Sequence, residues 1–166
     1  MTTELENNIF TKYPDLFKNF EKSGDDTIRF GIECGDGWYW LIDELMSNIN
    51  SHVKYNHEKK RIKNRLLRWV VSINTNFRLL KKLRKYIFKH AKYITYKQFP
   101  HVDVVQIKEK FGGLRFYYDG GDDIIFGMVL LAESMSLSTC ENCGTRINVK
   151  THKKNGWLYT RCDNCK

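Results

Sequence analysis

The chain has 166 residues, 14% of them aromatic, and a formal net charge of +9. Its length suits one domain with a small appendage, and the absence of an 18-residue apolar run argues against a transmembrane helix. The polar, acidic N-terminus lacks the apolar segment of a secretory signal, so we expect a cytosolic protein, in which five cysteines favour metal binding over disulfides.

The positive charge is concentrated in one segment. Residues 54–97 contain 15 Lys and Arg against a single acid, Glu58, whereas the rest of the chain holds 13 Lys and Arg and 18 Asp and Glu. A mildly acidic body with one strongly basic segment indicates an anionic partner for that segment, which would be nucleic acid, a membrane surface or an acidic protein.

The first predicted elements are a helix, a strand and a second helix. Residues 4–20 favour a helix with a turn at Tyr13-Pro14, residues 28–33 alternate like a β-strand, and residues 38–49 read as an apolar helix.

A tight loop, Cys-Gly-Asp-Gly at residues 34–37, joins that strand to the apolar helix. Cys34 precedes a helix N-terminus, where a thiolate gains stability, so Cys34 and Asp36 are candidate catalytic groups. In the alternative interpretation, Cys34 is a buried thiol and Asp36 caps the helix. No His partner for Cys34 is identifiable, and we therefore favour a protein that is not an enzyme.

The basic segment has the apolar spacing of a helix from about residue 55 to 93. No Gly or Pro occurs from 54 to 99, which predicts one long helix or two helices that break near residues 72–76. This helix could contact nucleic acid, lie on an anionic membrane, bind an acidic host protein or form a dimer, or its polar face could simply be solvated. The candidate ligand-binding residues are Lys60, Arg61, Arg65, Arg68, Lys81, Lys82, Arg84 and Lys85.

Residues 102–118 predict a β-hairpin that turns at Gly112-Gly113. One face would be apolar except for Glu109, a buried carboxylate that needs a partner and is a third candidate catalytic group. The other face is cationic and aromatic, and it could bind phosphate and stack a base. Its members are Lys108, Lys110, Arg115 and Tyr117. An ordinary exposed sheet face is the alternative.

The C-terminal region begins with a loop, residues 119–123, that caps a helix at 124–136. Two Cys-x-x-Cys pairs follow, separated by 18 residues. This spacing is typical of a four-thiolate zinc site, and because all four ligand positions are filled we expect a structural Zn²⁺. The predicted ligands are Cys140, Cys143, Cys162 and Cys165.

Four sequence blocks, in the order FGIECGDGWYWLIDEL, QIKEKFGGLRFYY, AESMSLSTCENCG and W-x-x-T-x-C-x-x-C, resemble small uncharacterised proteins carried by bacteriophages and prophages. The resemblance covers residues 9–50 and 102–165, and it implies that the basic segment is an insertion. It also implies a location in the cytoplasm of a bacterial host cell and an accessory role, such as countering host antiviral defence.

We therefore expect an α+β fold, with a small antiparallel sheet, packed helices, a long basic helical insertion and a C-terminal zinc ribbon. The predicted domains are a body, residues 1–138 with the insertion at about 54–97, and a ribbon, residues 139–166. The expected function is non-enzymatic binding of a phosphate-bearing ligand, either nucleic acid or a nucleotide signal. The alternatives are an adaptor that binds a host protein through the basic helix, and a small enzyme.

Overall fold

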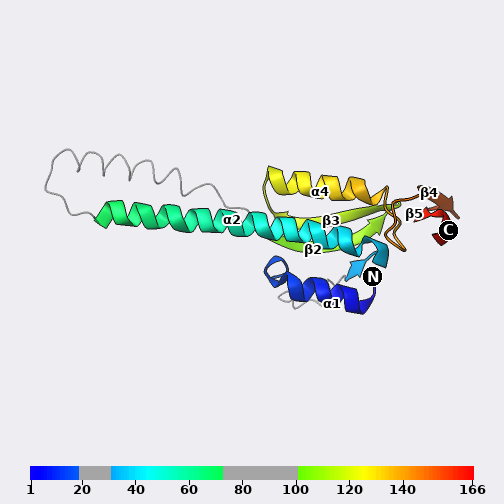
Figure 1. The fold of residues 1–166 in the computed structure, drawn as a ribbon, viewed down its shortest axis with the longest axis horizontal. Helices are drawn as coiled ribbons and strands as arrows, with labels where there is room; N and C mark the ends of the chain where they lie inside the picture. Colours follow the sequence, from blue (N-terminus) through cyan, green and yellow to red (C-terminus); the bar gives the residue numbers. More distant parts are fainter. Residues whose placement is uncertain (19–30, 73–100) are drawn as a thin grey trace. The chain divides into compact units, whose positions relative to one another are not determined.

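The computed structural model describes residues 1–18, 31–72 and 101–166, with side chains up to residue 57 in the second range. The chain divides into two compact units. The first comprises Met1–Ser51 and His101–Lys166, and the second comprises His52–Pro100. The first unit contains all the strands of the described part of the chain (Figure 1).

Short helical elements form the N-terminal part of the first unit. Helix α1 (Thr3–Lys12) is followed by a 3-10 turn, η1 (Pro14–Leu16), so the predicted turn at Tyr13-Pro14 is confirmed. Proline suits this first helical position because its ring presets φ and it has no N–H to leave unpaired. After strand β1 (Ile32–Glu33), a second 3-10 turn, η2 (Asp36–Trp38), leads into helix α2.

Helix α2 (Tyr39–Ser72) is continuous, where the sequence predicted one apolar helix ending near residue 49 and a separate basic helix beginning near 55. The physical reason is that no Gly or Pro interrupts residues 38–72, so nothing breaks the backbone hydrogen bonds between the two stretches. Within the first unit, the helix buries one apolar face. That face consists of Leu41, Ile42, Leu45, Met46 and Ile49.

Strands β1, β2 (Val102–Lys110) and β3 (Gly113–Gly120) form one sheet in the order β1-β2-β3. Strands β2 and β3 are antiparallel, but β1 pairs with β2 in parallel, with Ile32 opposite Ile107. The sheet is therefore mixed rather than purely antiparallel as expected. A parallel pair needs a long connection, and more than 60 residues separate these two strands along the chain.

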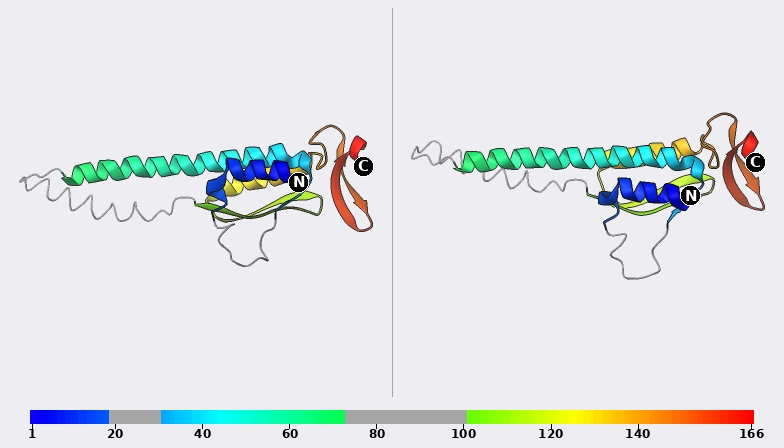
Figure 2. Two further views of the ribbon diagram at one scale, coloured as in Figure 1. Left: turned by 90° about the horizontal axis from the view of Figure 1, so that it is seen from below. Right: turned by 60° about the horizontal axis from the view of Figure 1, so that its bottom comes forward.

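Helix α4 (Asp123–Ser136) covers the β3 side of the sheet and begins one residue earlier than predicted. Asp122, which belongs to the predicted capping loop, accepts hydrogen bonds from the amides of Ile124 (3.2 Å) and Ile125 (3.0 Å). Side chains of α4 also accept hydrogen bonds from backbone amides of β3. The amide of Leu114 donates to Ser136 Oγ (2.9 Å), and that of Phe116 donates to Glu133 Oε1 (3.0 Å). Helices α1 and α4 and the first turns of α2 lie on one face of the sheet (Figure 2). Trp38, Ile42, Ile107 and Leu114 are buried in the core between these layers.

The hairpin turns one residue earlier than predicted. Lys110 pairs with Gly113 and Glu109 with Leu114, so the turn residues are Phe111 and Gly112, with φ of 56° and 78°. A two-residue turn of this type needs positive φ at both positions, and here Phe111 takes the place expected for Gly112. The assignment of the other residues to the two faces is unchanged. Phe111, expected on the apolar face, is 69% exposed.

The C-terminal residues form a two-stranded ribbon, β4 (Val149–Lys154) and β5 (Trp157–Cys162), closed by a short 3-10 turn, η3 (Asp163–Cys165). Asn155 and Gly156 make its turn with φ of 51° and 85°. We call residues 139–166 the ribbon. The predicted fold class, α+β with a cysteine-rich ribbon at the C-terminus, is confirmed.

Candidate metal centre

The four predicted cysteine ligands come together in the ribbon. Their sulfur atoms all lie within 4.8 Å of one another, and the Sγ atoms of Cys143 and Cys162 are 3.6 Å apart. Cys140 and Cys162 are buried, whereas Cys143 is exposed. Four thiols that converge in this way could hold a metal ion, as the spacing of the two Cys-x-x-Cys pairs predicted.

The backbone around the first pair forms a tight knuckle, residues 140–144. The amide of Gly144 donates to the carbonyl of Cys140 (2.8 Å), and Gly144 has φ of 75°, which favours glycine. Burial raises the pKa of Cys140, but hydrogen bonds from the amides of Cys162, Cys143 and Asn142 outweigh it and lower the pKa to about 6. At Cys140 these hydrogen bonds therefore favour the thiolate form that binds metal.

The knuckle packs directly against the loop at residues 34–37. The amide of Gly37 donates to the carbonyl of Glu141 (2.8 Å), and the amide of Gly35 donates to the Glu141 carboxylate (3.0 Å). A Cβ atom on Gly37 would lie 2.3 Å from the Cys140 carbonyl oxygen and 2.4 Å from the Gly144 nitrogen. Glycine is required here because two backbones meet. The amides of Gly35 and Gly37 are therefore both paired with Glu141.

Trp38 anchors the start of the ribbon from the body. Its side chain is fully buried, and its Nε1–H donates to the carbonyl of Thr139 at 2.9 Å. A buried indole N–H needs an acceptor, and the residue immediately before the first cysteine ligand supplies it. The body and the ribbon therefore share a hydrogen-bonded interface and not only a covalent link.

The tip of the β2–β3 hairpin contacts the ribbon at a second place. Thr160 Oγ1, fully buried, donates to the carbonyl of Gly112 at 2.5 Å. A Cβ on Gly112 would lie 3.1 Å from Thr151 Cγ2 and 3.2 Å from Thr160 Oγ1. Gly35 and Gly37 of the first sequence block and Gly112 of the second therefore lie where the ribbon meets the body.

Cys34, the candidate nucleophile, is buried beside this interface. Burial is the main reason that its pKa rises to about 12; the terminal amino group opposes the rise, and the carboxylates of Glu141 and Asp36 reinforce it. This environment disfavours the thiolate that nucleophilic catalysis needs. Asp36 is the first residue of the η2 turn, and its carboxylate accepts a hydrogen bond from the amide of Thr2 (2.6 Å).

Glu109, the third candidate catalytic group, has a structural partner. Its carboxylate accepts the amide of Gly112 at 2.6 Å and so stabilises the hairpin turn. It is partly exposed and not fully buried as expected. Burial is the main cause of the raised pKa of Cys34, and the carboxylates of Asp36 and Glu109 both lie near enough to add to it.

The four residues of the predicted phosphate-binding face of the hairpin differ in whether their charged groups are engaged by the protein itself. Lys108 Nζ lies 5.3 Å from the centre of the Tyr117 ring, and Lys110 Nζ lies 5.5 Å from that of Phe111. Arg115, however, bonds to the carbonyl of Leu114 (2.7 Å) and lies 3.7 Å from Glu133 of α4. Its guanidinium group is thus engaged with the body.

The structure presents a cationic and aromatic surface that the hairpin-centred prediction did not include. Alternate residues of β4 and β5 place Lys and Arg beside the rings of His152, Trp157 and Tyr159. The sequence signal was the alternation itself, which runs from residue 149 to 162. Of the two predicted clusters of basic residues, the first lies on α2 and consists of Lys60, Arg61, Arg65 and Arg68. The second, Lys81, Lys82, Arg84 and Lys85, lies outside the described residues.

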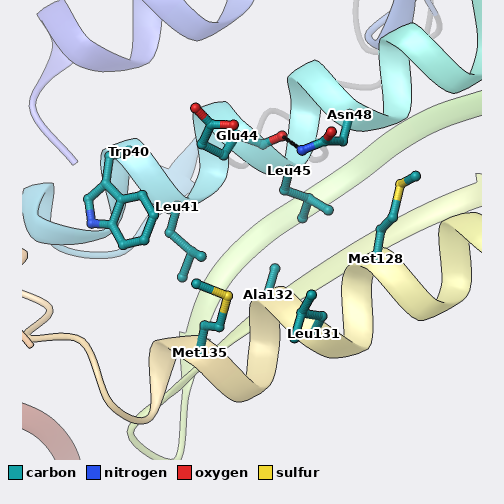
Figure 3. A pocket seen from close by; sticks show the side chains of 9 residues that line it. All are labelled: Trp40, Leu41, Glu44, Leu45, Asn48, Met128, Leu131, Ala132 and Met135. Carbon is teal, nitrogen blue, oxygen red and sulfur yellow. Dashed lines mark hydrogen bonds between the residues drawn. The ribbon is translucent and has the colours of Figure 1, made fainter.

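An apolar groove of about 440 Å³ lies between the first part of α2 and helix α4 (Figure 3). Trp40, Leu45, Leu131 and Met135 are among the side chains that line it, and Glu44 and Asn48 are its polar members. Asn48 Nδ2 is bonded to the backbone carbonyl of Glu44 (2.8 Å). The groove therefore lacks a set of converging polar groups that would indicate catalysis.

Comparisons of this chain with family models, with curated proteins and with solved structures found no match. The resemblance to phage and prophage proteins therefore stays a prediction. Within the part of the chain that the structure describes, none of the helices combines the length and apolar character of a membrane-spanning segment.

Proposed function

We propose that this protein is a zinc-stabilised, non-enzymatic binding protein for a phosphate-bearing ligand. The convergence of four thiols supports the metal. Tetrahedral zinc with Zn–S bonds of about 2.3 Å separates its sulfur atoms by about 3.8 Å. The pairwise limit of 4.8 Å and the Cys143–Cys162 separation of 3.6 Å are close to that value.

The proposed zinc ion is structural because thiolates fill all four positions and leave none for water or substrate. The side chain of Asn142 donates to Cys165 Sγ at 3.4 Å, which is the kind of outer hydrogen bond that orients a metal ligand. The metal would fold the ribbon and, through Glu141, hold the knuckle on the loop at residues 34–37.

Metal analysis of the purified protein tests this proposal. We expect one Zn²⁺ per chain by elemental mass spectrometry, and less than about a tenth of that in Cys143→Ser, because three thiolates bind far more weakly than four. Cys34→Ser is the matched control, since this thiol lies outside the cluster. Equal zinc content in wild type and Cys143→Ser would contradict the proposal.

Ligand binding is supported by one observation: within the described residues, the charges of Lys108 and Lys110 have no acidic partner. Each ammonium group lies over an aromatic ring, and neither forms an ion pair within the described residues. A phosphate could therefore pair with both cations, while Tyr117, which is 40% exposed, offers a ring on which a base can stack. Neither Cys34 nor Glu109 offers a comparable catalytic arrangement.

Fluorescence anisotropy with a labelled oligonucleotide, and calorimetry with nucleoside triphosphates, test this binding. We expect affinity for the oligonucleotide to fall steeply between about 50 and 200 mM salt. Lys108→Glu and Lys110→Glu should each weaken binding about fivefold or more, since each replaces an attraction by a repulsion. Lys18→Glu is the charge-matched control, because Lys18 is an exposed lysine outside the hairpin that already pairs with Asp15. Unchanged binding in both hairpin variants would refute the site.

The phage resemblance extends the proposal to an accessory protein that counters host antiviral defence by binding nucleic acid or a nucleotide signal. Both ligands carry phosphate, and the two assays above separate them. A basic protein that binds only the oligonucleotide would act on nucleic acid, and one that binds nucleotides at a defined stoichiometry would act on a nucleotide signal.

A further inference from the structure

Strands β4 and β5 present two faces with different roles. Residues opposite each other in an antiparallel pair share a face, and successive residues alternate between faces. One face contains Cys162, a metal ligand, and the Thr151–Thr160 pair that contacts the hairpin tip. We call the other the outer face. It consists of three cross-strand pairs, Lys150–Arg161, His152–Tyr159 and Lys154–Trp157.

The aromatic rings of the outer face are arranged for stacking. The rings of His152 and Tyr159 are stacked, with centroids 5.5 Å apart and an angle of 27° between their planes. Arg161 lies 5.2 Å from the centre of the same Tyr159 ring. Trp157, at the end of the ribbon, is 69% exposed. An exposed indole next to a stacked pair is costly to leave in water and suits a flat, π-rich partner.

Acids balance the charge of the outer face only in part, because Asp163 bonds mainly to Lys166 but also lies near enough to Lys150 and His152 to interact with their charges. Residues 149–162 contain no Asp or Glu. The nearby Asp163 pairs with Lys166 at 2.5 Å, and Glu141 is bonded to Gly35 at the interface with the body. Within the described residues, Lys150 and Lys154 have no ion-pair partner. Two exposed lysines therefore flank the rings. Their backbone positions lie about 13 Å apart, since a β-strand rises by about 3.3 Å per residue.

We propose that the outer face binds single-stranded nucleic acid. Unpaired bases would stack on Trp157 and on the His152–Tyr159 pair, and the phosphates between them would pair with Lys150 and Lys154. A duplex hides the faces of its bases, whereas a single strand exposes them to these rings. The inference rests on the proposed function for the class of ligand, but it places the contact on different residues.

The test measures anisotropy of a labelled oligothymidylate of about 12 nucleotides, which has no secondary structure and favours no base pairing. Trp157→Leu should weaken binding about tenfold, and Trp157→Phe should restore most of it, because the first removes stacking and the second retains it. Lys150→Glu and Lys154→Glu should each weaken binding and reduce the salt dependence. Lys153→Glu is the matched control, because Lys153 is exposed on the same strand but belongs to the opposite face.

The same variants are measured with a duplex of equal length and with heparin. Weaker binding of the single strand by Trp157→Leu, with heparin binding unchanged, supports the proposal. Equal losses in Lys153→Glu and Lys154→Glu, or no effect of Trp157→Leu on the single strand, would overturn it and leave charge attraction alone. Circular dichroism and zinc content show whether each variant folds. If Trp157→Leu does not fold, Trp157→Phe and the Lys variants decide the outcome.

The two binding proposals fail separately. If the hairpin variants Lys108→Glu and Lys110→Glu bind normally while Trp157→Leu does not, the hairpin site is wrong and the outer face stands. If the hairpin variants lose nucleotide binding and the ribbon variants bind the single strand normally, the reverse holds.

Discussion

Gly37 and Gly144 lie back to back, so close that a Cβ atom on Gly37 would come within 2.4 Å of the Gly144 nitrogen. One glycine belongs to the loop that follows β1, and the other closes the knuckle of the first two cysteine ligands. Together with the Gly37–Glu141 hydrogen bond of 2.8 Å, this contact makes the candidate metal centre part of the body's own packing.

Gly37→Ala should therefore separate the knuckle from the loop. The new methyl group would collide with backbone atoms of Cys140 and Gly144, which cannot rotate away as a side chain can. We expect a loss of about 1–3 kcal/mol in the free energy of unfolding, measured by denaturant titration in the presence of zinc.

Gly127→Ala is the control for that substitution. Gly127 lies in α4 with nothing within 4 Å of its hypothetical Cβ atom, and alanine favours a helix over glycine by up to about 1 kcal/mol. The variant should be as stable as the wild type or more stable. Equal effects of the two alanine substitutions would mean that the Gly37–Gly144 contact is not required.

Thr160→Val should weaken the second contact between the ribbon and the body. Valine keeps the shape of the side chain but loses the hydroxyl that donates to the Gly112 carbonyl, and that carbonyl would stay buried without its partner. The expected cost is about 1–3 kcal/mol in the free energy of unfolding. Amide exchange at the hairpin tip should accelerate in the same variant. A stability equal to that of the wild type would argue against this hydrogen bond.

Cys34 should make unfolding depend on pH in the alkaline range. Its folded-state pKa of about 12 exceeds the ordinary thiol value of 9.0, so the folded protein keeps the proton more tightly than the unfolded chain does. The contribution of Cys34 to stability is therefore intact below about pH 9 and is lost as pH rises toward 12. The difference in unfolding free energy between wild type and Cys34→Ala should fall across this range, and a constant difference would contradict the buried-thiol interpretation.

The same variant separates structure from chemistry. Because burial disfavours the thiolate, we expect Cys34→Ala to leave oligonucleotide and nucleotide binding unchanged. A loss of binding in a folded, zinc-replete variant would show that the thiol has a functional role that its environment does not indicate.

The sequence predicted elements that depend on local patterns. The capping loop at residues 119–123, the helix that follows it and the convergence of four cysteines were all predicted from short-range spacing, and the structure confirms them. The predicted hairpin turn, Gly112-Gly113, was wrong by one residue, because the turn uses Phe111 and Gly112. The preference of glycine for positive φ does not exclude another residue at one of the two turn positions. Gly113 is reserved for the strand, where a Cβ atom would lie 3.1 Å from Leu137.

Contacts between distant segments could not be predicted from one sequence. The Gly-Asp-Gly loop offers the same amides to a phosphate or to Glu141, and 106 residues separate Gly35 from Glu141 along the chain. Arg115 lies opposite Lys108 in the sheet, as the predicted face requires, but α4 also places Glu133 within 3.7 Å of it, which the sequence did not indicate. The outer face of the ribbon was visible as an alternating pattern, but its exposure depends on which face the hairpin tip covers.

Hydrogen exchange of the zinc-bound and zinc-depleted protein, resolved at single amides by nuclear magnetic resonance, tests the central claim most directly. The claim is that the metal holds the knuckle on the loop at residues 34–37. On removal of zinc, the amides of Gly35 and Gly37 should lose protection, because both donate to Glu141. The amide of Leu114, bonded to Ser136 in the body, should keep its protection. Protection of Gly35 and Gly37 that is unchanged in the zinc-free protein would contradict the account.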